Sequence, residues 1–218
     1  MDNFFAPKKK AKVENSEEEE VPTSAFASLI PSDVTYQMGV TDHDQEGRLV
    51  KVDFPLFSLI NCYIPNSGQK LERLEYRTQQ WDKDFLKYVQ EQPKPTIWLG
   101  DLNVAHTNLE VWNDGAKHLA KQAGVTQEER DSFQHQLDTS GFRDAFRALH
   151  PGAKGCYSYW SQRAGNRVPN KGLRLDYFCC APQFFDGSNT VVARDSYMLY
   201  DVLGSDHCPV VLELEVKK

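Results

Sequence analysis

Two short polar turns, each beside an apolar run, contain residue types that hydrolytic and metal sites use. Asp101 and Asn103 lie two positions apart after the run TIWLG, and the alternation of an extended chain would direct both to one side. A carboxylate and an amide oxygen suit a hard cation such as Mg²⁺, and an amide can also hydrogen bond to a phosphate. Taken alone, the two residues are more typical of an ordinary turn, because Asp and Asn side chains hydrogen bond to nearby backbone.

The second turn contains Asp206 and His207 and precedes the apolar run CPVVLELEV. A histidine beside a carboxylate can act as a general base near neutral pH, although such a pair can equally be a structural hydrogen bond. Asp176 is more informative, because it lies inside the apolar segment LRLDYFCC, where an unpartnered carboxylate costs free energy. We therefore expect Asp176 to orient and charge His207.

Two further polar side chains follow the apolar segment FSLINCYI. Tyr63 is close to its end, and Asn66 lies in the turn PNSG. Either residue could donate a hydrogen bond to a phosphate oxygen, while Tyr63 could instead cap the core. Acids, amides and a histidine at the ends of several apolar strands together indicate one site.

Hydrophobic periodicity predicts the elements that would position this site. The run 57–64 is apolar enough to be a central strand. Thr126 and Glu129 have the spacing of a capping box, which predicts the start of a helix. The expected strands are residues 48–54, 57–64, 96–100, 156–160, 173–180 and 208–216, and the expected helices are residues 69–91, 126–138 and 142–150. Long strands mixed with helices predict an α/β fold of stacked sheets with helices outside.

The composition fits one large domain with an uneven charge distribution. A chain of 218 residues can bury one substantial core. Its net charge is −6, yet residues 142–174 contain seven Lys and Arg residues against one Asp. This segment could receive an anionic substrate such as a nucleic acid while the rest of the surface repels it. An ordinary solvated face would have the same composition.

The five cysteines are odd in number and form no CxxC pair. We expect them to be reduced thiols of an intracellular protein rather than a zinc site. No apolar stretch approaches the length of a membrane span, and the start of the chain is polar. We therefore expect no membrane partner and no secretory signal.

Residues 1–31 are expected to be a disordered tail, because a basic cluster and then an acidic run leave almost no apolar side chains. The cluster PKKKAK resembles a nuclear import signal, which predicts localisation in the nucleus. The opening MDNFF faintly resembles a peptide that binds a sliding clamp, so a contact with a clamp or repair factor is an expectation of this tail. The folded domain would then span residues 32–218.

Seven phrases in one order resemble a known class of enzymes. They are HDQEGRLV, YIPNSG, RLEYRTQQWD, GDLNVAH, YSYW, RLDYF and GSDHCP, and they are similar to the exonuclease III class of apurinic/apyrimidinic endonucleases, within the endonuclease–exonuclease–phosphatase superfamily. The resemblance implies a four-layered α/β sandwich of two packed mixed sheets. It also implies hydrolysis of the phosphodiester 5′ to an abasic site in duplex DNA, with Mg²⁺ or alternatively Mn²⁺ as cofactor.

The resemblance implies a role for each matching residue. His207, paired with Asp176, would act on the attacking water or on transition-state charge. The implied catalytic set is Tyr63, Asp101, Asn103, Asp176 and His207, and the implied metal set is Asp101, Asn103, Asp206 and His207. Contacts with DNA are implied for Asn66, Tyr159, Trp160, Arg163, Arg167 and Lys171, with the aromatic pair lining a pocket for the flipped-out abasic sugar.

Two family phrases have no match in this chain. WNVNG and LQE supply an active-site Asn and the principal metal-binding Glu in the family, and neither occurs here. We therefore expect an incomplete first sheet that leaves Leu59 and Tyr63 exposed, as in a truncated or spliced product. Two functions stay open: an active endonuclease, or an inactive form that binds DNA or another protein. A phosphatase of the same superfamily would share GDLN and SDH but would not explain YIPNSG.

Overall fold

The computed structural model describes residues 29–217, which form two sheets and the helices around them. The predicted tail, with its import and clamp motifs, lies outside these residues except for positions 29–31. The six-stranded sheet has the order β1-β2-β3-β4-β6-β5, and β7 and β8 form a second sheet. The strands are β1 (Asp33–Thr35), β2 (Leu49–Asp53), β3 (Ser58–Cys62), β4 (Thr96–Asp101), β5 (Arg143–Asp144), β6 (Asp176–Cys180), β7 (Val191–Met198) and β8 (Val210–Val216).

The helices lie mainly between β3 and β6 along the chain. They are α2 (Thr41–Asp44), α3 (Leu74–Tyr76), α4 (Asp82–Gln90), α5 (Gln127–Ser140) and α6 (Ala145–Leu149). A π-helical turn, Arg77–Trp81, joins α3 to α4, and short 3-10 turns span Asn108–Glu110, Lys117–Lys121 and Pro182–Phe184. None of the helices in residues 29–217 has the length and apolar character needed to cross a membrane.

The strand pairing brings three segments to one edge of the larger sheet. β3 and β4 are parallel, joined by the α3–α4 crossover, and β6 runs antiparallel to β4. The ends of β3 and β4 therefore lie beside the start of β6. Asp101, the last residue of β4, is the direct cross-strand partner of Asp176, the first residue of β6.

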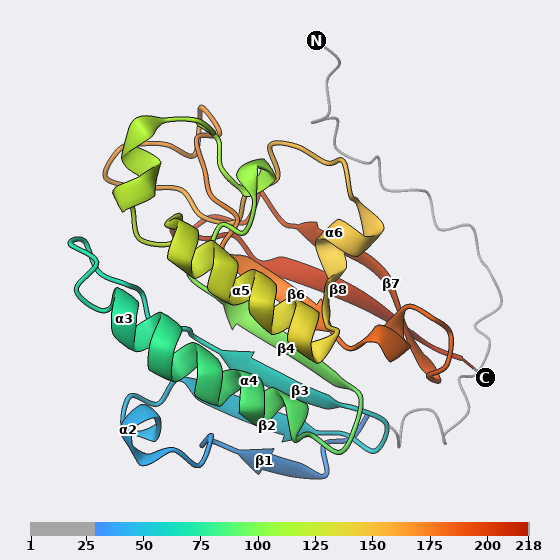
Figure 1. Cartoon of the computed structure of the whole chain (residues 1–218). Helices are drawn as coiled ribbons and strands as arrows, with labels where there is room; N and C mark the ends of the chain where they lie inside the picture. Colours follow the sequence, from blue (N-terminus) through green and yellow to red (C-terminus); the bar gives the residue numbers. More distant parts are fainter. Residues whose placement is uncertain (1–28, 218) are drawn as a thin grey trace, which may run out of the picture.

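Alternating side chains divide the core between the two faces of this sheet. Ile60, Trp98 and Cys179 are partners across β3, β4 and β6 and are fully buried, under α4 and α5. There the rings of Phe85 and Phe133 lie 4.9 and 5.7 Å from Trp98. The opposite face packs against the β7–β8 sheet through a separate apolar cluster. Figure 1 shows α4 and α5 in front of the larger sheet and β7 and β8 behind it.

The α/β class and the helix-covered mixed sheet are confirmed, while the number of layers differs from the expectation. Residues 29–217 form three layers, namely helices, a six-stranded sheet and a two-stranded sheet, rather than the expected four. Leu59 packs against the apolar cluster between the two sheets and is partly buried, so its expected exposure is not found, whereas Tyr63 is 47% exposed. That this chain is a truncated or spliced product stays a prediction.

Three predicted elements need correction. The helix expected from residue 69 begins at Leu74, because Gly68 and Leu71 have positive φ angles and turn the chain. Within 142–150, two residues join the sheet as β5, and the Asp144 side chain then accepts a hydrogen bond from the amide of Arg147 at the start of α6. Residues 156–160 form no strand, because Tyr159 makes only isolated bridges to Leu173 and His207.

The capping box is confirmed. The Thr126 hydroxyl accepts from the amide of Glu129, and the Glu129 carboxylate accepts from the amide of Thr126. The helix that it opens, α5, ends at Gly141, whose left-handed φ of 74° suits glycine. All five cysteines are free in the structure, as their odd number and spacing indicated.

Candidate active site

His207 lies between two carboxylates at the edge where β4 ends. Its Nδ1 atom is 2.7 Å from Oδ2 of Asp176, and its Nε2 atom is 4.0 Å from Oδ2 of Asp101. The first distance is a hydrogen bond, whereas the second is too long for one. The side chains of His207 and Asp101 are 27% and 16% exposed, so the site is sheltered but open to solvent.

Ser158 connects the two segments that carry this pair. Its hydroxyl oxygen accepts hydrogen bonds from the amides of Leu175 and Asp176, at 3.0 and 3.1 Å. Its carbonyl accepts from the amide of Cys208 at 2.8 Å. Ser158 is fully buried, so these contacts hold the start of β6 beside the turn that carries His207.

The end of β4 contains a glycine at a position that leaves no room for a side chain. Gly100 has a φ of +129°, and a Cβ atom there would lie 2.0 Å from the carbonyl oxygen of Cys62. Only glycine permits this close approach of β3 and β4. Asn103 follows with a φ of 48°, and its amide nitrogen donates to Oδ1 of Asp101 at 2.9 Å.

The two predicted amides meet directly. Nδ2 of Asn66 donates to Oδ1 of Asn103 at 2.8 Å, and Nδ2 of Asn103 donates to the carbonyl of Ile64 at 2.9 Å. Asn66 is exposed while Asn103 is buried. Each side-chain amide carries a second N–H, so the pair can present donors to an anion beside Asp101.

The environment raises the pKa of both groups that face each other across the 4.0 Å gap. Burial and the nearby charge of Asp176 raise the pKa of Asp101 to about 6, against the amide of Asn103 and the charges of His207 and Arg77. Burial lowers the pKa of His207, but the hydrogen bond and charge of Asp176, with the charges of Asp101 and Asp206, leave it above its ordinary value. Both groups can therefore exchange protons near neutral pH.

The site thus combines two groups that can transfer protons, Asp101 and His207, with the two amides of Asn66 and Asn103. Comparison with known proteins shows the family of the chain. Residues 29–207 match the model of the Endonuclease/Exonuclease/phosphatase family. This chain is a member of that family. The likeness to apurinic/apyrimidinic endonucleases and exonucleases that the seven phrases indicated is thereby confirmed at the level of the family.

Relatives and solved structures agree with the family. The chain is 40% identical over 191 residues to a DNA-(apurinic or apyrimidinic site) endonuclease of Dictyostelium discoideum, covering 86% of this chain and 51% of that protein. It is 40% identical over 196 residues to an exodeoxyribonuclease of Bacillus subtilis, covering 89% and 74%. The crystal structure of the AP endonuclease LMAP from Leishmania major matches with a TM-score of 0.75 and 32% identity, covering 85% of this chain and 61% of that one. The chain thus spans about half to three quarters of the length of these proteins.

The predicted metal ligands do not converge as a set. Within residues 29–217, no three His, Cys, Asp or Glu side chains lie where they could hold one ion together. Asp101 and His207 face each other, whereas the backbone carbonyl of Asp206 accepts from the amide of Trp160. The side chains of residues 29–217 therefore do not enclose a metal ion with protein ligands alone. A Mg²⁺ ion here would depend on one carboxylate with waters and substrate oxygens, a ligand set that Mg²⁺ accepts.

The residues predicted to contact DNA fall into two groups. Arg163 and Lys171 are exposed, and the ring of Tyr159 lies 5.1 Å from that of His207. Trp160 is buried, with its indole nitrogen donating to Asn170. The guanidinium of Arg167 donates to four carbonyls, those of Tyr200, Val202, Ser205 and His207, so it anchors the loop before β8. Contact with DNA stays a prediction for all six residues.

Sequence reasoning missed residues that hold the site without facing it. Ser158 is one, and Arg77, which donates to the carbonyls of Leu102 and Asn103, is another. A buried arginine in RTQQWD has no distinctive pattern, because charged residues in a helical segment are typical of a solvated face. The only available signal was that Arg77 belongs to the phrase RLEYRTQQWD.

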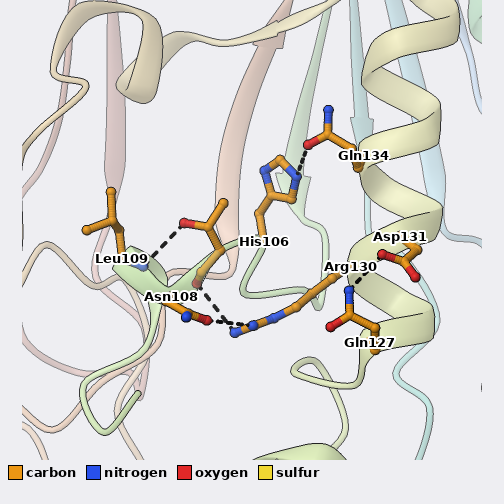
Figure 2. Close-up of a pocket in the computed structure, with 8 residues that line it drawn as sticks. His106, Asn108, Leu109, Gln127, Arg130, Asp131 and Gln134 are labelled. Atoms are coloured by element: carbon orange, nitrogen blue, oxygen red, sulfur yellow. Dashed lines mark hydrogen bonds between the residues drawn. The ribbon is translucent and has the colours of Figure 1, made fainter. Parts of the chain in front are cut away.

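A surface cavity of about 400 Å³ lies apart from the candidate active site. Figure 2 shows it between the segment after β4 and α5, with His106 hydrogen bonded to Gln134. Arg130 donates to the carbonyl of Ala105 and to Asn108. None of the residues that line the cavity belongs to the Asp101–His207 site, so it does not enter the proposed chemistry.

Proposed function

We propose that this chain acts in DNA base excision repair, hydrolysing the phosphodiester 5′ to an abasic site in duplex DNA. The observation that supports this most is the placement of His207 between Asp176 and Asp101, beside the Asn66–Asn103 pair. Hydrolysis of a phosphodiester is accelerated by groups that transfer protons and by amides that donate hydrogen bonds to the negatively charged phosphate oxygens. The proposal includes dependence on Mg²⁺ and, from the basic cluster near the start of the chain, a place in the nucleus.

Each side chain of the site has its own role in the proposed hydrolysis. Asp176 accepts from Nδ1 of His207, which leaves Nε2 directed toward the space beside Asp101. A water in that space would give its proton to His207 or Asp101 as its oxygen bonds to phosphorus, because the pKa of each group is raised above its ordinary value. The bond from phosphorus to the 3′ oxygen of the preceding nucleotide would break, and that oxygen would take a proton from the same two side chains or from water. The amides of Asn66 and Asn103 would donate to a phosphate oxygen, and the exposed Tyr63 would contact the same group. When bound, Mg²⁺ would stabilise the charge on the phosphate oxygens.

An incision assay tests the proposal. The purified full chain is incubated with a duplex oligonucleotide that carries one abasic-site analogue, in Mg²⁺ and in chelator. We expect cleavage 5′ to the analogue in Mg²⁺, lost in His207→Ala and retained in His135→Ala, which changes an exposed histidine of α5. Circular dichroism confirms folding of each protein. A folded chain that does not cut, or that cuts equally well in His207→Ala, would overturn the proposal.

The second candidate is a protein of the same family that binds DNA or another protein without cutting. One observation favours it, namely the lack of a cluster of three metal-ligating side chains among the described residues. Fluorescence anisotropy with the same oligonucleotide separates the two functions. Binding to the abasic duplex without incision at any Mg²⁺ concentration supports the second candidate.

A further inference from the structure

A buried ion pair lies behind the turn that follows β4. Arg77 and Glu129 are 1% and 0% exposed, and Nη1 of Arg77 is 3.2 Å from Oε1 of Glu129. Arg77 belongs to the π-helical turn and Glu129 to the first turn of α5. The two helical segments lie side by side over the sheet (Figure 1). A buried pair adds little net stability as a rule, so its other contacts indicate what it does.

The arginine side holds the turn that carries Asp101 and Asn103. Nη1 of Arg77 donates to the carbonyl of Asn103 at 2.6 Å, and Nη2 donates to the carbonyl of Leu102 at 2.8 Å. These carbonyls belong to buried residues, and Asn103 is held at a φ of 48°. Without the guanidinium, both would need another donor in a buried site. Arg77 therefore fixes the backbone from which Asn103 presents its side chain.

The glutamate side holds the turn that carries Asn66. Oε1 of Glu129 accepts a hydrogen bond from the hydroxyl of Ser67, which is fully buried. Oε2 accepts from the amide and hydroxyl of Thr126, at 3.1 and 2.8 Å. Each oxygen of the carboxylate thus has its own partners, and one of them is the residue next to Asn66.

We propose that the Arg77–Glu129 pair is a positioning device that sets Asn66 and Asn103 relative to each other and to Asp101. The chain of contacts runs from Ser67 through Glu129 and Arg77 to the carbonyl of Asn103, and the Asn66–Asn103 hydrogen bond closes it into a ring. A π-helical turn shifts the register of side chains along a helix, and this one begins at Arg77. The proposal rests on the proposed function only in its effect on rate, because the coupling of the two turns is a property of the folded chain.

Amide hydrogen exchange tests the coupling without any need for activity. The amide of Asn103 donates to Asp101 and that of Gly68 donates to Oδ1 of Asn66, so both report on the turns. In Arg77→Met and Glu129→Gln we expect both amides to exchange at least about ten-fold faster than global destabilisation alone requires. The matched control is Leu137→Ala on α5, which removes buried apolar contacts without a polar link to the site.

The outcomes separate clearly. Joint acceleration at both turns in the two pair variants, absent in Leu137→Ala, supports the coupling. Acceleration at only one turn, or equal acceleration throughout the sheet, overturns it. Ser67→Ala, which leaves the ion pair intact, should accelerate exchange at Gly68 more than at Asn103; the reverse order would contradict the path through Ser67.

Rate measurements on the abasic duplex add a readout that bears on both proposals. Displacement of catalytic groups by about 1 Å can cost on the order of 10²-fold in rate, so we expect kcat to fall in Glu129→Gln with little change in KM. Failure of the wild-type chain to cut would overturn the proposed function while hydrogen exchange still decides the coupling. An unchanged kcat in a variant whose turns are shown to open would overturn the positioning role.

Discussion

The imidazole of His207 is held by Asp176, a residue 31 positions earlier in the chain, through a hydrogen bond of 2.7 Å at Nδ1. Because Asp176 begins β6 and pairs with Asp101 across the sheet, this contact places both carboxylates on one imidazole. The two acids therefore influence the same proton, and their separate contributions can be measured.

Replacing the charge of Asp176 should lower the pKa of His207. In Asp176→Asn the side chain keeps its shape and loses its charge, so only the charges of Asp101 and Asp206 remain to oppose burial, which lowers the pKa of His207. NMR titration of the His207 ring in metal-free protein measures the change. A titration curve identical to that of the wild type would contradict the assignment of Asp176 as the charge partner.

The same pair makes folding stability depend on pH. The folded-state pKa of His207 is raised, so the stabilisation is fully present below the ordinary histidine pKa of about 6.5 and is lost as pH rises through the folded value. Urea unfolding midpoints of wild type and Asp176→Asn should therefore converge at alkaline pH. If the two urea midpoints stay equally far apart from acid to alkaline pH, the stability difference comes from packing and not from charge.

The ionisation of Asp101 should set the pH below which kcat/KM falls. Its pKa is about 6, against an ordinary 3.8, so an active ionised form would lose activity below about pH 6. The raised value also means that its contribution to stability is present below pH 3.8 and is lost as pH rises through about 6. The measurement is kcat/KM from about pH 3.5 to 8. An acid limb near pH 4 would show that Asp101 has an ordinary pKa or that its ionisation is not required.

Gly100→Ala should destabilise the fold and displace Asp101. The new Cβ would meet the carbonyl oxygen of Cys62 at 2.0 Å, and a φ of +129° is strained for alanine. Overpacking of this kind costs roughly 1–3 kcal/mol, and backbone strain adds to it. Urea unfolding gives the value. The control is Gly152→Ala, where no atom lies within 4 Å, and an equal cost in both variants would contradict the steric account.

Lys171 and Arg167 should differ in their effect on DNA binding. Lys171 is exposed, with its ammonium 5.0 Å from the ring of Trp112, so Lys171→Ala should reduce the salt slope of binding by about 1. Arg167 donates to four backbone carbonyls, so Arg167→Ala should lower stability and change the slope little. Anisotropy at several salt concentrations measures the slopes, and the reverse ranking would show that Arg167 contacts phosphate.

The parts of the fold that sequence patterns predicted are those with local signals. β2, β3 and β4 followed from apolar runs, and the Thr126–Glu129 spacing found the start of α5. Asp176 was paired with His207 because a lone carboxylate in an apolar segment needs a partner. These predictions succeeded because a few neighbouring residues were enough to show that another local structure would be unfavourable in free energy.

The parts that were missed depend on distant contacts. β7 escaped prediction because a register shift between Ala193 and Asp195 interrupts the alternation of side chains. The segment 156–160 alternates like a strand, yet its Ser158 bonds to β6 and to the turn of Cys208 instead of forming a ladder. Arg77 reads as a surface charge until the fold places two carbonyls beside it.

The parallel pairing of β3 and β4 through one helical crossover has a consequence for how the molecule assembles. Tyr63 and Asn66 follow β3, and Asp101 and Asn103 lie at the end of β4, so with Glu129 of α5 the amide half of the site can form from contacts within about a third of the chain. The Asp176–His207 half must wait for β6 and the β8 turn to arrive from far along the sequence. Because closing long loops slows folding, the Asn66–Asn103 pair should form before the Asp176–His207 pair.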